Sequence, residues 1–345
     1  MTEPPARLAN DDADVAGLAR GARALADRGA WEVVCALLES EPRLTSGSGE
    51  LGLLYGEALL RVGRTQEGHD ALRRILPRLE EQGELAPRLK ALNLFGASLL
   101  ELGALDGAAA TFQHVAELAM REHDDLLVAK ARNNLAAIAN IRGHHEEARG
   151  LYLLALAAYQ RLGSPSGLAE CHHNIAITFR DEGELERAEE HEQRAIEHAR
   201  EAGSGRLAAL ALLGRAEIQL RRGDPAGAEA GAREAAAAFR EAGDPICEGD
   251  ALRLVGVACT AQANLVDARL ALESALALLR GHDAALNEAE TVRALAEWAA
   301  AAGDAAAAGA HGQAAANLFK RLGAAEEVVR LDSWLAALGT FSAPD

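Results

Sequence analysis

The sequence predicts an all-α fold, an α-solenoid built from a helical repeat, on the basis of three observations. The first is a constant spacing of 40 residues between turn-forming positions. The second is a pair of columns of small residues that keep the same spacing. The third is a composition in which Ala and Gly together make up about a third of the 345 residues, with only 9 Pro and 3% aromatic residues. Such a composition favours closely packed helices over a large sheet.

Two series of turn residues set the repeat. We call the residues of the first series hinges; they are Gly63, Gly103, Gly143, Gly183, Gly223, Ala263 and Gly303. A second series lies midway between them: Gly83, His123, Gly163, Gly203, Gly243, Asp283 and Gly323. Two turns in each period divide every repeat into two helices of about 17 residues.

Small residues recur on both sides of each hinge. Seven positions before it stand Gly56, Gly96, Ala136, Ala176, Ala216, Gly256 and Ala296. Five positions after it stand Gly68, Ala108, Ala148, Ala188, Ala228, Ala268 and Ala308. Two helices approach closely only where no bulky side chain separates their backbones. These columns therefore predict the contact between the two helices of each hairpin.

The columns resemble the tetratricopeptide repeat, whose small positions keep the same offsets of twelve and seven residues. The usual period of that repeat is 34 residues, so a 40-residue unit is similar to the longer repeats of kinesin light chains and bacterial peptide-sensing regulators. The resemblance covers residues 47–322. It implies a right-handed superhelix of about eight helical hairpins plus a C-terminal capping helix, in which the first helix of each hairpin lines a concave groove.

The ends depart from the regular pattern. We expect an N-terminal tail and a degenerate capping hairpin over 1–46, the repeat array over 47–322, a capping helix over 323–338 and a flexible tail over 339–345. The Ser- and Gly-rich residues 45–49 are expected to form a flexible joint. The stretch before the array is short and partly repeat-like, which argues against an effector module in this chain.

The charge balance bears on the partners. A net charge of −17 with no cluster of Lys and Arg disfavours nucleic acid and anionic membrane surfaces. The longest apolar run, residues 151–159, is far shorter than the ~20 residues of a membrane span, and the N-terminus does not resemble a signal peptide. We expect a cytoplasmic protein with four reduced cysteines and no cofactor.

A candidate peptide-binding groove follows from helical geometry. Positions thirteen, ten, six and three before each hinge share one face of the first helix, and position nine borders it. In the first half of the array these positions hold the candidates Lys90, Asn93, Lys130, Asn133, Asn134, Asn140, His173, Asn174 and Arg180, and also Glu170. Farther along, the same positions hold Glu217, Asp250, Arg253, Glu290, Arg293 and Glu297.

The asparagines are the informative part of this groove. Asn is a mediocre helix former, whereas its amide both donates to and accepts from an extended peptide backbone. In the long-repeat proteins that the chain resembles, groove asparagines hold bound peptides, which implies this role for Asn93, Asn133, Asn134 and Asn174. The alternative is that these side chains bond between neighbouring repeats or face water.

Catalysis and metal binding find little support. Eight of the eleven histidines lie between His114 and His198, but adjacent histidines on a helix point about 100° apart and no HExxH spacing occurs. Nucleophile-elbow and phosphate-loop motifs are missing from the sequence too. We therefore expect a non-enzymatic protein without a metal site.

The sequence thus favours an interaction scaffold or adaptor that binds a peptide or protein segment in its groove. The alternative is a regulatory protein that responds to a signal peptide and acts on a separate effector. Either function requires a protein or peptide partner, and the oligomeric state stays open.

Overall fold

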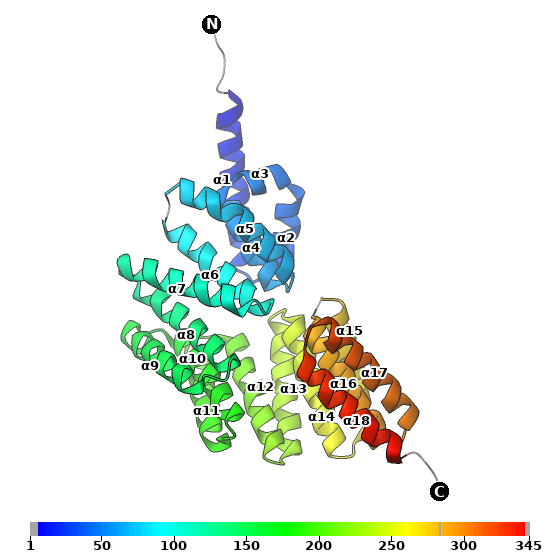
Figure 1. Ribbon diagram of the computed structural model, residues 1–345. Coiled ribbons are helices and arrows are strands. Elements are labelled where there is room, and N and C mark those ends of the chain that lie inside the picture. Colours follow the sequence, from blue (N-terminus) through cyan, green and yellow to red (C-terminus); the bar gives the residue numbers. More distant parts are fainter. Residues whose placement is uncertain (1–5, 84, 283, 342–345) are drawn as a thin grey trace. The chain divides into compact units, whose positions relative to one another are not determined.

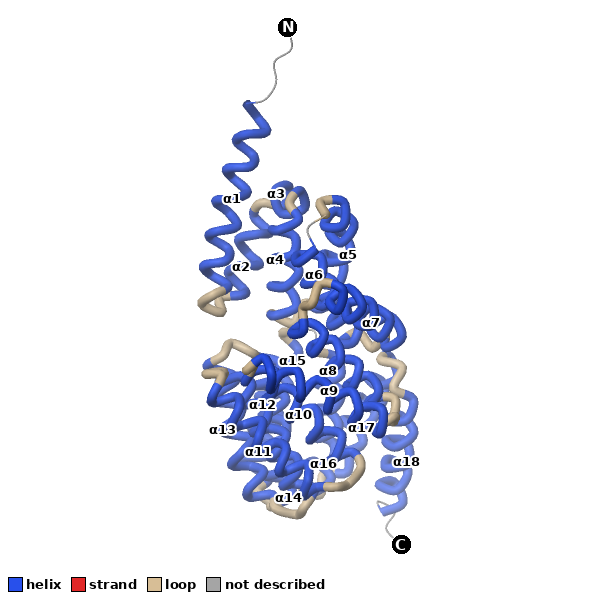
Figure 2. Tube along the Cα trace, turned by 90° about the vertical axis from the view of Figure 1, so that its left-hand side faces the viewer, coloured by secondary structure: helices blue, strands red, loops and turns tan. Residues whose placement is uncertain are grey.

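The computed structural model describes residues 6–83, 85–282 and 284–341, and every regular element in these ranges is a helix (Figure 2). The helices are α1 (Ala6–Ala26), α2 (Trp31–Ser40), α3 (Pro42–Gly47), α4 (Gly49–Arg61), α5 (Thr65–Glu81), α6 (Leu85–Glu101), α7 (Leu105–Arg121), α8 (Asp125–Ile141), α9 (His145–Leu162), α10 (Pro165–Asp181), α11 (Leu185–Glu201), α12 (Gly205–Arg221), α13 (Pro225–Glu241), α14 (Pro245–Ala261), α15 (Leu265–Arg280), α16 (Ala285–Ala301), α17 (Ala305–Arg321) and α18 (Ala325–Phe341). This confirms the all-α prediction.

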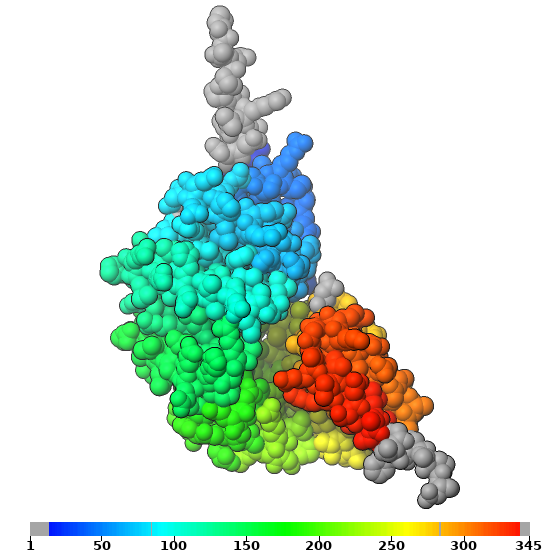
Figure 3. Space-filling model, viewed as in Figure 1, coloured from blue at the N-terminus to red at the C-terminus, as the bar shows by residue number. Residues whose placement is uncertain are grey.

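The chain divides into two compact units, unit 1 over residues 1–167 and unit 2 over residues 168–345. Within each unit, helices that follow one another in sequence pack side by side (Figure 1). The space-filling view shows the same order, because the colours change progressively along each unit (Figure 3). Each repeat therefore buries its apolar face on its sequence neighbours, as a solenoid does.

The turns lie where the 40-residue spacing predicts them. Every hinge has a positive φ, and so do the described residues of the second turn series. Even Ala263 (φ 59°) and His123 (φ 58°) adopt this left-handed conformation, which L side chains rarely enter. A turn that requires a positive φ explains the preference for glycine at the other turn positions. Asp283 lies outside the described residues.

The small-residue columns mark the hairpin contacts, as predicted. A Cβ atom added to Gly96 would lie 2.8 Å from the Phe112 ring, and one added to Gly56 would lie 2.7 Å from Leu72. Both bulky partners stand nine positions after their hinges and are fully buried. The second helix of each of these hairpins therefore packs a large side chain against the bare backbone of the first.

The N-terminal joint differs from the sequence expectation. Instead of a flexible joint, residues 42–47 form α3, and Thr45 is buried with its Oγ1 donating to the Leu38 carbonyl oxygen at 2.8 Å. The Ser48 hydroxyl accepts from the Leu51 N–H at 3.3 Å and caps α4. The hydroxyl groups of Thr45 and Ser48 thus bond to backbone groups nearby and order the segment.

At the other end, α18 covers the last hairpin. A Cβ added to Gly312 of α17 would lie 2.6 Å from the Leu335 side chain, so the two helices are in close contact. The helix continues through Phe341, past the expected end at residue 338. Residues 342–345 of the expected tail, like residues 1–5 at the N-terminus, lie outside the described residues.

Two further features concern the described residues as a whole. None of the four cysteines takes part in a disulfide, and Cys35, Cys171 and Cys259 are buried. Burial raises the pKa of the Cys247 thiol to about 12. Among the described helices, none combines the length and the apolar character that a membrane span requires.

Candidate functional site

The first helices of the hairpins form a row in each unit. We call α4, α6, α8, α10, α12, α14 and α16 the A helices, and the surface at positions thirteen, ten, nine, six and three before the hinge the A-helix face. Contacts join α4 to α6 and α6 to α8 in unit 1, and α12 to α14 and α14 to α16 in unit 2. Side chains on this face can therefore meet between neighbouring repeats.

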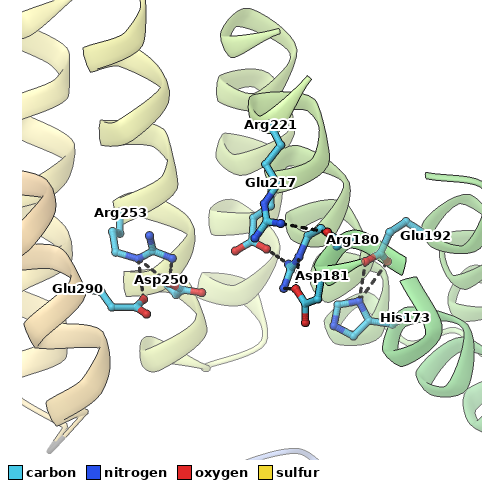
Figure 4. A network of polar contacts seen from close by, with 9 residues as sticks. All are labelled: His173, Arg180, Asp181, Glu192, Glu217, Arg221, Asp250, Arg253 and Glu290. Atoms are coloured by element: carbon cyan, nitrogen blue, oxygen red, sulfur yellow. Dashed lines mark hydrogen bonds and ion pairs between the residues drawn. The ribbon is translucent and has the colours of Figure 1, made fainter. Parts of the chain in front are cut away.

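In unit 2 the A-helix face carries a network of polar contacts (Figure 4). Arg180 on α10 forms an ion pair with Glu217 on α12, and its Nη2 lies 3.4 Å from Asp181 Oδ1. Arg221 Nη1 donates to the Arg180 carbonyl oxygen at 3.1 Å. This part of the network thus joins α10 to α12.

The network continues on the next two A helices. Arg253 Nη2 lies 2.7 Å from Asp250 Oδ1 on its own helix, and Arg253 Nε lies 3.6 Å from Glu290 Oε2 on α16. Burial opposes the charge of Arg253, but the two carboxylates outweigh it and keep the pKa of the guanidinium above its usual range. Burial also raises the pKa of Glu290, against the effect of Arg253.

The same pattern extends to the end of the array. Arg293 Nη1 on α16 lies 3.0 Å from Glu327 Oε2 on α18, and its Nε lies 4.0 Å from Glu297 Oε1. Arginines and carboxylates are interspersed along the face, and the carboxylates are in excess. Such a surface offers many hydrogen-bond donors and acceptors and some negative charge, which suits a polar chain better than a polyanion.

A buried acid–imidazole pair lies beside this network. The carboxylate oxygens of Glu192 on α11 lie 3.0 and 3.1 Å from Nδ1 of His173 on α10 (Figure 4). The Glu192 side chain is 1% exposed and the His173 side chain 20%. Burial raises the pKa of Glu192, against the effect of His173. For His173 burial opposes the charge, but Glu192 outweighs it and raises the pKa of the imidazole.

Of the other predicted groove residues in unit 2, Arg180 belongs to the network, and Asn174 follows His173 on α10 and is partly buried. The structure thus brings the histidine and the arginine into one polar region. Glu192 was not predicted as a site residue. The signal was present in the sequence, because Glu192 stands in a column that is otherwise free of charged residues.

In unit 1 the predicted residues are less connected. Lys90 Nζ on α6 lies 2.6 Å from Glu57 Oε2 on α4, which joins neighbouring A helices. The Asn93 Oδ1 atom is buried and has no hydrogen-bond partner among the described residues. Glu57 is a further residue that the sequence prediction missed, although it stands six positions before its hinge.

The remaining predicted residues lie on α8. Lys130 is exposed, Asn134 is partly buried and Asn133 is only 4% exposed. Asn140 is 9% exposed, and its Oδ1 lies 2.9 Å from Nδ1 of His145 on the following helix. Lys130 and Asn134 have exposed surface, as residues that contact a peptide need, whereas Asn140 bonds to the following helix, as the alternative predicts.

Each unit also has a cavity on its A-helix face. In unit 1 a cavity of about 570 Å³ lies between α1, α4 and α6, and its lining includes Leu53 and the Arg23–Glu50 and Lys90–Glu57 ion pairs. In unit 2 a cavity of about 200 Å³ is lined by Trp334 and by the charged side chains of α16 and α18. Both cavities adjoin charged pairs of the A-helix face.

A second histidine cluster lies between α10 and α11. The Nδ1 atoms of His172 and His191 lie 3.0 Å apart, and the rings of His172 and His198 are stacked with centroids 5.7 Å apart. Burial lowers the pKa of His172 to about 3 and that of His191 to about 4. Over the described part of the chain, no group of three or more His, Cys, Asp or Glu side chains is arranged to hold a metal ion.

With this geometry in view, comparison with known proteins identifies the repeat. Residues 127–201 match the tetratricopeptide repeat family model. No curated protein matches the sequence.

Solved structures share the fold along most of the chain. One is a Rap protein complexed with competence and sporulation factor, with a TM-score of 0.62 and 16% identity over 95% of this chain and 98% of the other. A second is the apo form of the quorum sensor NprR from B. thuringiensis, with a TM-score of 0.54 and 16% identity over 95% and 99%. A third is the Rap conjugation gene regulator of plasmid pLS20 in complex with the Phr* peptide, with a TM-score of 0.68 and 12% identity over 81% and 76%.

Residues 127–201 therefore match the tetratricopeptide repeat, and the chain shares its fold with these regulators. This confirms the resemblance drawn from the small-residue columns. At such low identity the likeness concerns the fold, and the function has to be argued from the site.

Proposed function

We propose that this chain is a peptide-responsive regulatory protein: a peptide binds along the A-helix face, and its binding changes how the chain acts on a separate effector protein. The observation that carries the proposal is the polar network of unit 2. Its side chains come mainly from four successive A helices, and they intersperse guanidinium and carboxylate groups along a surface that crosses the repeats.

An extended peptide is the ligand that this surface suits. Each peptide unit has one donor and one acceptor, so it can bond with both kinds of group that the network offers. The nine predicted groove residues remain the candidates for direct contact, with His173, Asn174 and Arg180 nearest to the network. One of the solved structures that share the fold is a Rap regulator in complex with the Phr* peptide, and another is a Rap protein complexed with competence and sporulation factor.

Peptide selection tests the first part. The full chain would be used to select binders from a displayed library of random peptides, and the affinity of a selected peptide would be measured by calorimetry. Replacing Asn174 and Asn134 by Ala should weaken binding by about tenfold or more. The matched control is Asn317→Ala, at an exposed position on α17. Equal affinities in all variants, or failure to select any peptide, would contradict the proposal.

Effector capture tests the second part and separates it from the adaptor function. The immobilised chain would be incubated with lysate of the source cells, with and without the selected peptide. If the chain is a regulator, it should retain an effector protein, and the retained amount should change when the peptide is added. This effector should bind to a surface of the chain outside the A-helix face. An adaptor should retain a protein whose own segment competes with the peptide and is lost in the Asn174→Ala variant.

A further inference from the structure

Glu192 stands where the repeat otherwise places residues without charge. The residue nine positions after the hinge is a buried side chain or glycine in every other repeat of the array: Leu72, Phe112, Tyr152, Ala232, Leu272 and Gly312. Glu192 occupies this position after Gly183 and is equally buried. Burying a carboxylate costs free energy that a well-packed apolar side chain would not. Packing alone therefore does not explain a glutamate here.

The surroundings of Glu192 are adapted to its carboxylate. Both of its oxygens lie within hydrogen-bond distance of His173 Nδ1, at 3.0 and 3.1 Å. Opposite the pair stands Gly214 of α12, where an added Cβ would collide with the Glu192 carboxylate and lie 3.3 Å from His173 Cε1. Three successive helices thus enclose one charged pair, and the missing side chain at Gly214 makes room for it.

The pair is directed at the A-helix face. His173 stands ten positions before its hinge, and its side chain keeps 20% of its surface exposed. Glu192 occupies Nδ1, which leaves Nε2 on the other side of the ring; Nε2 has no hydrogen-bond partner within residues 6–83, 85–282 and 284–341. The other charged groups that act on the ring are Arg180 on the same helix and Glu217 on α12.

We propose that His173 contacts the bound peptide, with its Nε2–H donating to a carbonyl or carboxylate oxygen of the ligand, and that Glu192 is the positioning residue that determines this polarity. The inference rests on the proposed peptide-binding function. With Nδ1–H bound to Glu192, a neutral imidazole has a lone pair on Nε2 and would accept, whereas the imidazolium donates from both nitrogens. The carboxylate behind the ring favours the imidazolium and so selects a ligand oxygen.

The test is Glu192→Gln, which keeps the shape of the side chain and removes its charge. A peptide selected by the wild-type chain from a displayed random library serves as the probe. At pH 7 the variant should bind it about tenfold more weakly, while Glu197→Gln, at an exposed position of the same helix, should bind like the wild type. Wild-type affinity should fall as pH rises through the titration of His173. In the variant this fall should occur at lower pH.

Nitrogen-15 spectra of the imidazole supply a readout that does not depend on the peptide. His173 should titrate at higher pH in the wild type than in Glu192→Gln. Glu192→Leu places an apolar residue at this position and checks the fold. It should melt no lower than the wild type, and it should bind the peptide more weakly than the wild type does.

The possible failures are distinct. A wild-type chain that selects no peptide overturns both this inference and the proposed function. Peptide binding that keeps its strength and its pH profile in Glu192→Gln overturns the role of the pair and leaves the proposed function standing. A large loss of stability in Glu192→Leu would show that the pair serves the fold, and would likewise overturn the inference.

Discussion

Mild acid should destabilise unit 2 through the histidine cluster between α10 and α11. His172 is 6% exposed and His191 is partly buried, and burial lowers their pKa values to about 3 and about 4 from 6.5. The nearby positive groups Arg194 and Arg187 act in the same direction, and Glu190 opposes them for His191. The stacked ring of His198, which also lowers the pKa of His172, is paired with Glu201 at 3.2 Å.

The sign and size of the effect follow from proton linkage. A histidine whose pKa is lowered by folding contributes stability that is fully present above pH 6.5 and is lost as the pH falls towards the folded-state pKa. Between pH 7.5 and pH 5 the loss is about 2 kcal/mol for His172. His191 adds about 1 kcal/mol to this loss. Its contribution is smaller because its ring is only partly buried, and because its repulsion with His172 is already included in the lowered pKa of His172.

Urea unfolding at the two pH values measures this loss. In a Trp31→Phe background the two remaining tryptophans, Trp298 and Trp334, lie in unit 2 and report on it. A loss of about 3 kcal/mol should lower the urea midpoint by roughly 1–2 M. His172→Leu introduces the residue that the same repeat position has at Leu92 and Leu212, and it should remove most of the pH dependence.

His311→Leu, on α17 outside the cluster, is the control and should retain the wild-type pH dependence. The comparison between variants isolates the cluster from carboxylates that titrate in the same range. If the wild type and His172→Leu lose the same stability between pH 7.5 and pH 5, the reasoning from burial of the two rings is refuted.

Further changes test the packing and the network. Ala148→Leu, at a fully buried hairpin contact, should lower the free energy of unfolding by ~1–3 kcal/mol; an unchanged urea midpoint would show that the contact tolerates bulk. Gly96→Ala should destabilise by a similar amount because its Cβ would press on the Phe112 ring, whereas Gly150→Ala has nothing within 4 Å and should stabilise its helix by about 1 kcal/mol. Thermal melts that rank these two glycine variants the other way would contradict the contact geometry. Arg253→Ala should cost about 3–5 kcal/mol, because it leaves two half-buried carboxylates without their cation; neutralising both carboxylates in the same variant should recover much of that loss in urea unfolding.

The repeat itself was predictable because its causes are local and recur. A hinge needs a positive φ, which favours glycine, and a close hairpin contact needs a small residue at a constant offset. Gly96 illustrates the hairpin contact, because Phe112 occupies the space that a side chain at position 96 would take. Residues 45–49 were predicted wrongly because composition suggested flexibility, whereas Thr45 and Ser48 bond to particular backbone groups. Those bonds depend on where the chain turns, which composition does not record.

The candidate site, too, was predictable from the sequence only in part. The spacing of positions on a helix sufficed to put His173 and Arg180 on one face, and Glu192 could have been noticed as a charge in a column otherwise without one. The partners of these residues were decided by tertiary structure: Glu192 reaches His173 across a hairpin, and Arg180 reaches Glu217 on the next A helix. Helical periodicity determines the direction of a side chain within its own helix. The distance and rotation between two helices depend on packing that involves many side chains at once, so only the folded chain determines which charges meet.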